Sequence, residues 1–455
     1  MSAHGEVAAY PSLRRENRRL GHIPGDYGLP VLGHTLEFVR HPARLSARMY
    51  RKYGPVYRSE VLFQRGVALM SAEGNRFVLR DREGNFSSYL GWQPVLGRLF
   101  PRGLMLRDGD DHRYQRRIMQ AAFRKEALAE YVDRMNPGIA SGIAAWRDRD
   151  RLRFYPAIKQ LTLDLAATVF LGLQLGPEAE RVNRAFMDTV RASIAVVRLP
   201  LPGLAWDRGL RGRRFLEDFL RDLIPAKRAG GGADFFSQIC RARSEDGEAY
   251  DDREIVDHMI FLMMAAHDTT TSALTTMIHA LGEHPEWQER VREELRSVGG
   301  DRLGYEELDR LELTGRVFRE ALRMNPPLPS MPRRTVRDCE FQGYRIPANT
   351  LVSISPSFTH HFSGYWREPQ RFDPERFSRE RAEHRQTPFA WIPFGGGAHM
   401  CIGLHFAEMQ VKAFLHQFLR RYRVHLPADY RPRYAIVPIS RPRDGLPVTL
   451  EPLDG

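Results

Sequence analysis

The spacing of hydrophobic residues along the chain predicts a mainly helical protein with a small amount of sheet. Apolar and polar residues alternate at 55–71 and at 339–355, as they do in hairpin strands, and turns are expected at QRG (64–66), QG (342–343) and PAN (347–349). A third alternating stretch, 434–450, contains Asp444-Gly445, which predicts a turn between two strands. Between 73 and 325 the pattern favours helices joined by loops.

Composition supports a folded chain with a core of ordinary size. Of 455 residues, 42% are hydrophobic and 27% charged, which is typical of globular proteins and excludes a wholly disordered chain. Length alone suggests about three domains. No linker, repeat or low-complexity tract divides the sequence, however, so length does not decide the number of domains.

Cysteine use and hydropathy predict a cytoplasmic protein without a transmembrane segment. The three cysteines, at 240, 339 and 401, include no close pair, which argues against a disulfide framework and against a Cys-x-x-Cys site. The first thirty residues lack the apolar centre of a signal peptide. The longest apolar run, 259–266, is far shorter than the ~20 residues needed to cross a bilayer.

The formal net charge of +12 comes almost entirely from arginine. Such a positive charge could bind nucleic acid. However, the arginines are dispersed and no helix-turn-helix, zinc-finger or RNA-stacking motif accompanies them. An acidic protein partner or a phospholipid surface is the better interpretation.

The stretch PFGGGAHMCIG, 393–403, is the most unusual in the chain. Its glycines let the backbone pass close to a flat or bulky group. Cys401 comes just before a predicted helix, 404–422, where the helix N-terminus and a nearby cation, His399, would favour the thiolate. The alternative is a buried structural cysteine. A single thiolate cannot hold zinc or an iron–sulfur cluster, but it can hold haem iron from one side.

Phe394, Gly397, Cys401 and Gly403 match the F-x-x-G-x-x-x-C-x-G signature, and this segment resembles that of the cytochrome P-450 family of haem-thiolate monooxygenases. The resemblance implies a haem b cofactor with Cys401 as the iron ligand. It also implies that the other three signature residues surround the haem and that His399 contacts a haem propionate.

A predicted helix at 254–281 carries AAHDTT, which is similar to the A-G-x-D/E-T-T segment over the distal face of the haem. Ala265 matches the first position, while Ala266 stands where the family has glycine. The resemblance implies that Thr269 hydrogen-bonds the bound dioxygen and that Asp268 relays protons. Judged from the residues alone, threonines that bond to their own helix backbone are the simpler explanation.

Further matches to the family are charged residues that the family buries in ion pairs or places against the haem. Glu320 and Arg323 stand three residues apart on a predicted helix, and the family pairs such residues with a later arginine, here Arg376, in a structural lock. The resemblance also assigns propionate contacts to His112, Arg116 and Arg333, with Arg334 as a competitor for the last role. Taken singly, each could be an ordinary surface charge.

The resemblance extends over nearly the whole chain, 1–455, from a proline-rich segment at about 21–38 to the last predicted strands. It implies one mainly α domain, the triangular prism of the family, with a small segregated β region. The implied reaction inserts one oxygen atom of O2 into a C–H bond or alkene. A peroxide-using peroxygenase and a haem sensor without turnover are the alternatives, although the Asp268-Thr269 pair argues against the peroxygenase.

Electrons must come from elsewhere, because no flavin- or dinucleotide-binding motif and no cysteine cluster is present. A separate ferredoxin or flavodoxin is expected to donate the electrons. The chain itself is expected to be a monomer. The docking surface is predicted on the cysteine side, at Arg113, Arg117, Arg124 and Lys412.

Apolar residues at the positions of the family's pocket walls predict a large hydrophobic substrate, such as a terpenoid, steroid, retinoid or fatty acid. The proline-rich segment and NPPLPSMPR favour the sterol and retinoid end of this range. The segment 199–216, apolar and then basic, could touch anionic lipid transiently or be an ordinary loop. The predicted wall residues are Phe86, Tyr89, Leu90, Trp92, Leu99, Met264, Ala265, Leu328, Pro329 and Met331.

Overall fold

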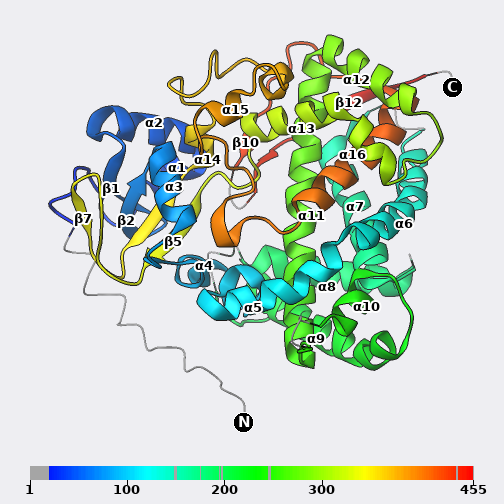
Figure 1. Ribbon diagram of the computed structural model, residues 1–455, viewed down its shortest axis with the longest axis horizontal. Helices are drawn as coiled ribbons and strands as arrows, with labels where there is room; N and C mark the ends of the chain where they lie inside the picture. The colour runs from blue at the N-terminus through cyan, green and yellow to red at the C-terminus, as the bar shows by residue number, and fades with distance from the viewer. Residues whose placement is uncertain are drawn as a thin grey trace.

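The computed structural model describes residues 20–147, 151–174, 176–193, 195, 198–243, 247–436 and 439–453. Figure 1 shows a body of packed helices beside a smaller region in which most of the β-strands gather. The long helix α11 (Asp252–Glu283) runs through the middle of the helical body, where it packs against α7, α9 and α13. The fold is therefore mainly α with segregated sheets, as the sequence predicts.

The remaining elements surround this helix and the sheet. The helices are α1 (Thr35–Arg40), α2 (Pro42–Tyr53), α3 (Ala72–Arg80), α4 (Ser88–Leu96), α5 (Gly109–Gln120), α6 (Lys125–Ala144), α7 (Phe154–Ala166), α8 (Pro177–Ser193), α9 (Ala205–Ala229), α10 (Phe235–Arg241), α12 (Pro285–Val298), α13 (Glu312–Met324), α14 (Pro356–Thr359), α15 (Glu383–Gln386) and α16 (Leu404–Arg421). The strands are β1 (Val56–Val61), β2 (Gln64–Leu69), β3 (Phe86–Ser87), β4 (Leu152–Arg153), β5 (Met331–Thr335), β6 (Cys339–Phe341), β7 (Tyr344–Ile346), β8 (Leu351–Ile354), β9 (Tyr422–His425), β10 (Tyr434–Ala435), β11 (Arg441–Pro442) and β12 (Pro447–Pro452).

The largest sheet has the strand order β1-β2-β8-β5-β3 and so joins the two hairpin regions predicted from the sequence. β1 and β2 pair antiparallel, but the turn lies at Leu62-Phe63, two residues before the predicted glycine-containing turn. Both turn residues have positive φ, 52° and 62°, which matches the twist of a two-residue hairpin without any glycine. The sequence pattern alone therefore places this turn wrongly.

Two further strand predictions are wrong in their pairing or extent. The stretch 434–450 does not form one hairpin about Asp444-Gly445: β10 pairs with β11, while β12 pairs with β4 and β9. Strands also occur within the region predicted to be helical, at β3 and β4, and outside the three predicted places, at β5 and β9. β3 and β4 are only two residues long, too short to show an alternating pattern.

A buried ion-pair cluster joins α13 to the chain that leads to the 393–403 loop. The Glu320 carboxylate accepts hydrogen bonds from Arg323 Nε and Nη2 at 2.7 and 2.8 Å, and Arg376 Nε lies 3.4 Å away. All three side chains are fully buried, so each charge needs the others. The predicted geometry of this lock is present.

The 393–403 loop lies against α3. Gly397 has a φ of 64°, and a Cβ on it would overlap the carbonyl oxygen of Leu79. Gly395 has a similar φ of 70°, but the atom closest to its Cβ would be His399 O at 3.8 Å. Both glycines therefore have a left-handed backbone conformation that would strain any other residue, but only Gly397 lacks space for a side chain.

This difference predicts unequal effects of alanine. Gly397→Ala adds a backbone clash to the cost of about 1–2 kcal/mol for a left-handed residue, whereas Gly395→Ala carries the backbone cost alone. We expect G397A to lower the urea midpoint of unfolding much more than G395A, measured by tryptophan fluorescence. Equal midpoints for the two variants would contradict the close packing of this loop on α3.

Candidate active site

Cys401 lies between a short 3-10 turn (Gly397–His399) and the start of α16, as the sequence predicts. The side chain is exposed on one side, although protein atoms crowd the sulfur elsewhere. Burial raises the pKa of the thiol, while the N–H of Gly403 and the charge of Arg116 act in the opposite direction. A Cβ on Gly403 would lie 4.0 Å from the Cys401 sulfur and 4.0 Å from the ring of Phe123, which is ordinary van der Waals contact.

Four cationic or basic side chains, His112, Arg116, Arg333 and His399, gather near this loop. The rings of His112 and His399 lie 3.9 Å apart between centroids. Burial, together with the charges of its neighbours, lowers the pKa of His112 to about 4 and that of His399 to about 2. Burial and neighbouring positive charge thus disfavour the charged form of His399, and the cation whose charge lowers the pKa of the Cys401 thiol is Arg116.

The two adjacent arginines of β5 differ in their partners. Successive side chains of a strand point to opposite faces. Arg334 donates to Asn349 O at 3.0 Å, whereas the described hydrogen bond of Arg333 goes only to the carbonyl of the preceding residue, Pro332, at 2.8 Å. Burial lowers the pKa of Arg333 to about 10, and Asp108 and Asp81 partly offset this. Arg333 thus belongs to the group near Cys401, while Arg334 is held elsewhere.

The middle of α11 is exposed on one side only. Met264, Ala265, Ala266 and Thr269 are half-buried, whereas nearly all of the rest of this helix is buried. Thr269 Oγ1 donates to Ala265 O at 2.6 Å, so the simpler interpretation of this threonine, a bond to its own helix, is present in the structure. Its position on the exposed side still leaves the hydroxyl oxygen able to accept a hydrogen bond.

Asp268 lies on another side of the helix and is paired. Lys159 Nζ on α7 donates to Asp268 Oδ1 at 2.7 Å, and His267 Nδ1 lies 3.4 Å from the same oxygen. Burial alone would raise the pKa of Asp268, but His267 and the Lys159 ammonium outweigh it, and the pKa lies well below its ordinary value. The carboxylate is therefore ionised and held at neutral pH.

The predicted pocket residues fall into two groups. Half-buried ones keep surface free for a ligand, while fully buried ones contribute to the core. Phe86, for example, packs edge-on against Phe77 with ring centroids 5.3 Å apart, and Leu99 is 1% exposed within the main core. The half-buried residues are Tyr89, Leu90, Trp92, Met264, Ala265 and Leu328; the buried ones are Phe86, Leu99, Pro329 and Met331.

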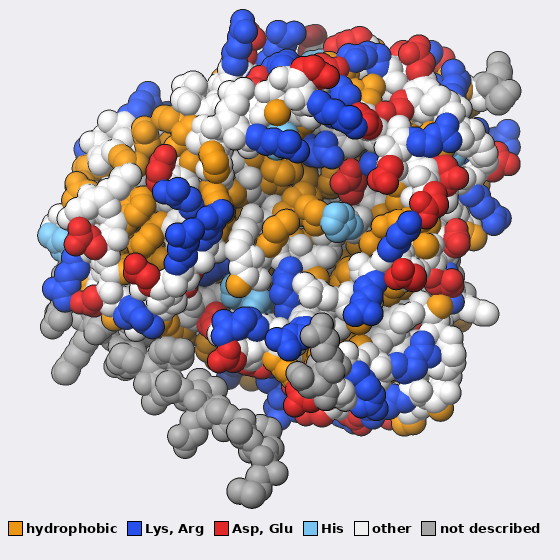
Figure 2. Space-filling model, viewed as in Figure 1, with side chains coloured by type: hydrophobic (Ala, Val, Ile, Leu, Met, Phe, Trp, Pro, Cys, Tyr) orange, Lys and Arg blue, Asp and Glu red, His pale blue; other side chains and the backbone are white. Residues whose placement is uncertain are grey.

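Surface charge is distributed rather than concentrated. Figure 2 shows Lys and Arg side chains spread among Asp and Glu over one face, with hydrophobic side chains gathered in a hollow near its centre. Of the predicted docking residues, Arg113, Arg117 and Arg124 are exposed. Lys412 is not, because it is buried, donates to Leu308 O at 2.9 Å and pairs with Glu408 at 3.0 Å. The prediction that Lys412 contacts a partner is wrong.

The 199–216 segment forms the start of α9 and the turn before it. Leu199 and Leu201 are exposed by 53% and 54%, while Trp206 is buried in the core. The aromatic residue is therefore not available to a lipid surface. None of the helices in the described part of the chain has the length and apolar character needed to cross a membrane.

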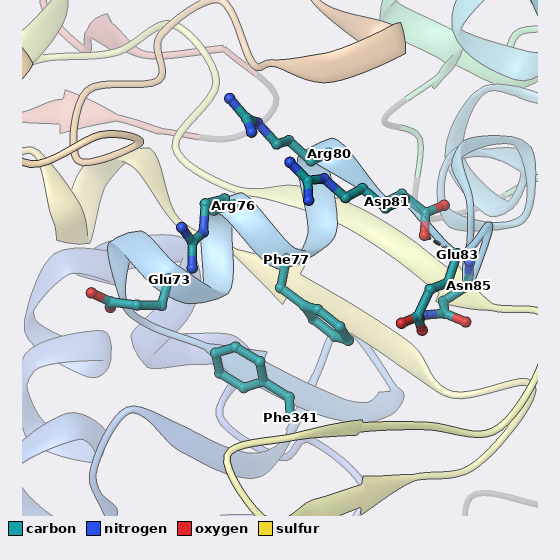
Figure 3. Close-up of a pocket in the computed structure, with 9 residues that line it drawn as sticks. Glu73, Arg76, Phe77, Arg80, Asp81, Glu83, Asn85 and Phe341 are labelled. Carbon is teal, nitrogen blue, oxygen red and sulfur yellow. Dashed lines mark hydrogen bonds between the residues drawn. The ribbon is translucent and has the colours of Figure 1, made fainter.

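A separate surface pocket of about 330 Å³ lies along α3 and the turn that follows it. Figure 3 shows the rings of Phe77 and Phe341 next to one another there, with centroids 5.0 Å apart. Arg76, Arg80 and Asp81 also line it, and it contains none of the residues predicted from the sequence.

Three residues near the site, of which only His360 is fully buried, carry no signal in the sequence. Lys159 holds Asp268 from a position 109 residues earlier. Asp108 accepts a hydrogen bond from the Ser88 N–H at 2.7 Å at the start of α4 and lies 3.7 Å from His399. His360 accepts a hydrogen bond from the Ile392 N–H at 2.9 Å. Each acts through a partner far away in sequence, which spacing alone cannot reveal.

The chemistry of these groups fits a haem. Two histidines and two arginines gather here, of which His112 and Arg333 are buried. Asp108 lies 3.7 Å from His399, and the two propionates of a haem would supply further negative charge. The exposed side chain of Cys401 and the exposed side of α11 would be available to a flat macrocycle. Within the described ranges no group of three or more His, Cys, Asp or Glu side chains could hold a metal ion. A single cysteine thiolate can hold haem iron from one side.

Comparisons with known proteins agree with this chemistry. The family described as "Cytochrome P450" matches residues 23–437. "Putative cytochrome P450 136" of Mycobacterium tuberculosis is 42% identical over 436 residues, covering 94% of this chain and 88% of that protein. "Taxane 10-beta-hydroxylase" of Taxus cuspidata is 27% identical, covering 94% of this chain and 89% of that protein.

A solved structure is also similar. "Retinoic acid bound cyanobacterial CYP120A1" superposes with a TM-score of 0.86 at 29% identity, covering 95% of this chain and 99% of the other. The match of sequence and fold over almost the whole length shows that the chain is a haem-containing monooxygenase and belongs to the cytochrome P450 family.

Proposed function

We propose that this cytochrome P450 oxygenates a large hydrophobic molecule, of the terpenoid, steroid, retinoid or fatty-acid kind. The observation that carries the proposal is the wall of half-buried apolar side chains, from Tyr89, Leu90 and Trp92 on α4 to Met264 on α11. A taxane hydroxylase and a retinoic acid-bound protein are among the similar proteins, which supports the same size class.

Cys401 would hold the haem iron, and His112, Arg116, Arg333 and His399 would hold the propionates. When bound, the haem supplies activation of dioxygen, which the thiolate promotes. Thr269, on the exposed side of α11, would accept or donate a hydrogen bond at the oxygen-binding face. Asp268 would pass protons toward it from the side of Lys159, whose side chain is 21% exposed.

Electrons would come from a separate acidic ferredoxin or flavodoxin that docks at Arg113, Arg117 and Arg124. We also infer that 1–455 acts as one domain, as a monomer and in the cytoplasm. The inference of a separate donor rests on the absence of cofactor motifs for electron transfer in the sequence, and that of its docking surface on the exposed arginines of α5 and the adjoining turn.

The test of the proposed function is spectroscopic. We expect the reduced, CO-treated protein to show a strongly red-shifted Soret band that Cys401→Ser abolishes. Terpenoids, steroids, retinoids and fatty acids are then screened by the spin-state change that they induce. A band typical of histidine ligation, or bulky hydrophobic ligands that never change the spin state, would contradict the proposal. Turnover with peroxide but not with an electron donor would favour a peroxygenase, and no turnover at all a sensor.

The pairing of Asp268 predicts a pH-dependent contribution of Lys159 to stability. Because the pKa of Asp268 is lowered in the folded protein, the ion pair stabilises it above the ordinary pKa of ~3.9, and this stabilisation is lost as pH falls. We expect Lys159→Gln to cost about 1–3 kcal/mol at neutral pH and less in acid. Urea unfolding across pH measures this difference.

The double variant K159Q/D268N provides the control. If the two side chains act as a pair, adding K159Q to D268N costs much less than adding it to the wild type. A pH-independent cost of K159Q in both backgrounds would show that Lys159 acts through packing alone.

Electrostatic docking predicts a salt-dependent rate of electron transfer. We expect R113Q/R124Q to slow reduction by an acidic ferredoxin about tenfold at low ionic strength and hardly at all at high ionic strength. R296Q/R302Q removes the same charge from exposed positions on and after α12, far from α5 in Figure 1, and serves as the matched control. Equal slowing by both pairs would indicate a net-charge effect without a specific surface.

A further inference from the structure

We propose that His360 is a positioning residue that connects the buried lock of α13 to the loop carrying Cys401. The inference rests on the proposed role of Cys401 as the haem ligand. His360 caps the C-terminus of α14 and is fully buried. Its main-chain oxygen accepts a hydrogen bond from Arg323 Nη1 at 2.8 Å, and its ring Nε2 accepts one from the N–H of Ile392 at 2.9 Å.

Hydrogen bonds continue from Ile392 to the cysteine. Ile392 is 2% exposed, and its carbonyl accepts from the Gly395 N–H at 3.0 Å. The carbonyl of Phe394 accepts from the Cys401 N–H at 2.9 Å. The start and the end of the loop are thus tied to each other, and the start is tied to His360. Through His360 the position of the loop depends on Glu320 and Arg323, which lie on a different helix.

The bond to Ile392 requires one form of the imidazole. An acceptor Nε2 carries no proton, so the ring must be neutral with its proton on Nδ1. Burial, and then the neighbouring charges of His361 and Arg323, lower the pKa of His360 well below its ordinary value, against the opposing effect of main-chain carbonyls. The same arginine that binds the His360 carbonyl therefore favours the neutral ring that the loop needs.

A neighbouring contact holds the same segments but cannot replace this one. Asn75 on α3 donates to Thr359 Oγ1 at 3.2 Å and to Phe389 O at 2.9 Å. It fixes the chain three residues before Ile392 and leaves the Ile392 N–H without an acceptor if the imidazole is removed. A buried N–H without an acceptor destabilises its local structure, and this cost falls on the loop.

The first measurement uses the unmodified holoprotein. With ¹⁵N-labelled histidine, NMR is expected to show His360 as the neutral Nδ1–H tautomer. Observation of the Nε2–H tautomer or of a charged ring would overturn the proposal, because neither can accept from Ile392. This result does not depend on any variant folding.

The second measurement compares variants of the full-length holoprotein. Gln places an oxygen acceptor near the position of Nε2, whereas Leu fills the space without one. We expect H360L to speed amide exchange of the peptide containing Ile392 at least about tenfold, and to convert part of the red-shifted CO Soret band to one of ordinary position. H360Q is expected to retain both properties of the wild type.

His361→Gln is the matched control, since His361 Nδ1 contacts Ser357 O at 3.1 Å and not the loop. If H360L exchanges and absorbs as the wild type does, or if H361Q causes the same changes, the proposal is wrong. If H360L does not fold, H360Q decides the question. Amide exchange of the peptide containing Ile392 that is much faster in H360Q than in the wild type would refute the proposal. A wild-type protein that lacks the red-shifted band would refute the haem-thiolate function, whereas the tautomer and the exchange rates would still decide the role of His360.

Discussion

The site depends on one interaction, the buried ion pairing of the Glu320 carboxylate with two arginines. A fully buried carboxylate is costly unless it is paired and hydrogen-bonded, and here Arg323 and Arg376 meet it from two segments of the chain. Because each arginine also donates to main-chain oxygens, the cluster orders irregular backbone that has no regular secondary structure to hold it. Only such an external frame can hold a glycine-rich loop in one conformation.

The distal side follows a different physical arrangement. On α11 the two residues of the acid–alcohol pair point to different surroundings: Thr269 is half-buried on the exposed side, while Asp268 is ion-paired with Lys159. The pairing keeps the carboxylate ionised. It also connects α11 to the ammonium of Lys159, whose side chain is 21% exposed. In the proposed function, a proton would reach the interior through these charged groups rather than through open water.

The sequence predicts this site better than it predicts the sheet. Cys401, the Glu320–Arg323 spacing and the i, i+4 pair His112 and Arg116 are local patterns, and local patterns survive folding. The turn at Leu62-Phe63 and the pairing of β12 with β9 depend on twist and on distant neighbours, which periodicity does not report. Lys412 was misplaced for the same reason: a lysine on a helix gives no sign in the sequence that its ammonium reaches Leu308 and Glu408.

The charge state of His399 illustrates a limit of reasoning from proximity in sequence. Standing two residues from a cysteine, a histidine looks like the cation that would favour a thiolate. In the fold its ring lies against that of His112 at a tilt of 33°, and burial together with the charges of His112, Arg333 and Arg116 lowers the pKa of His399. Negative charge brought in by two propionates would reverse part of that effect. A haem bound as proposed would thus place charge opposite to that of Arg116 and Arg333 among these side chains.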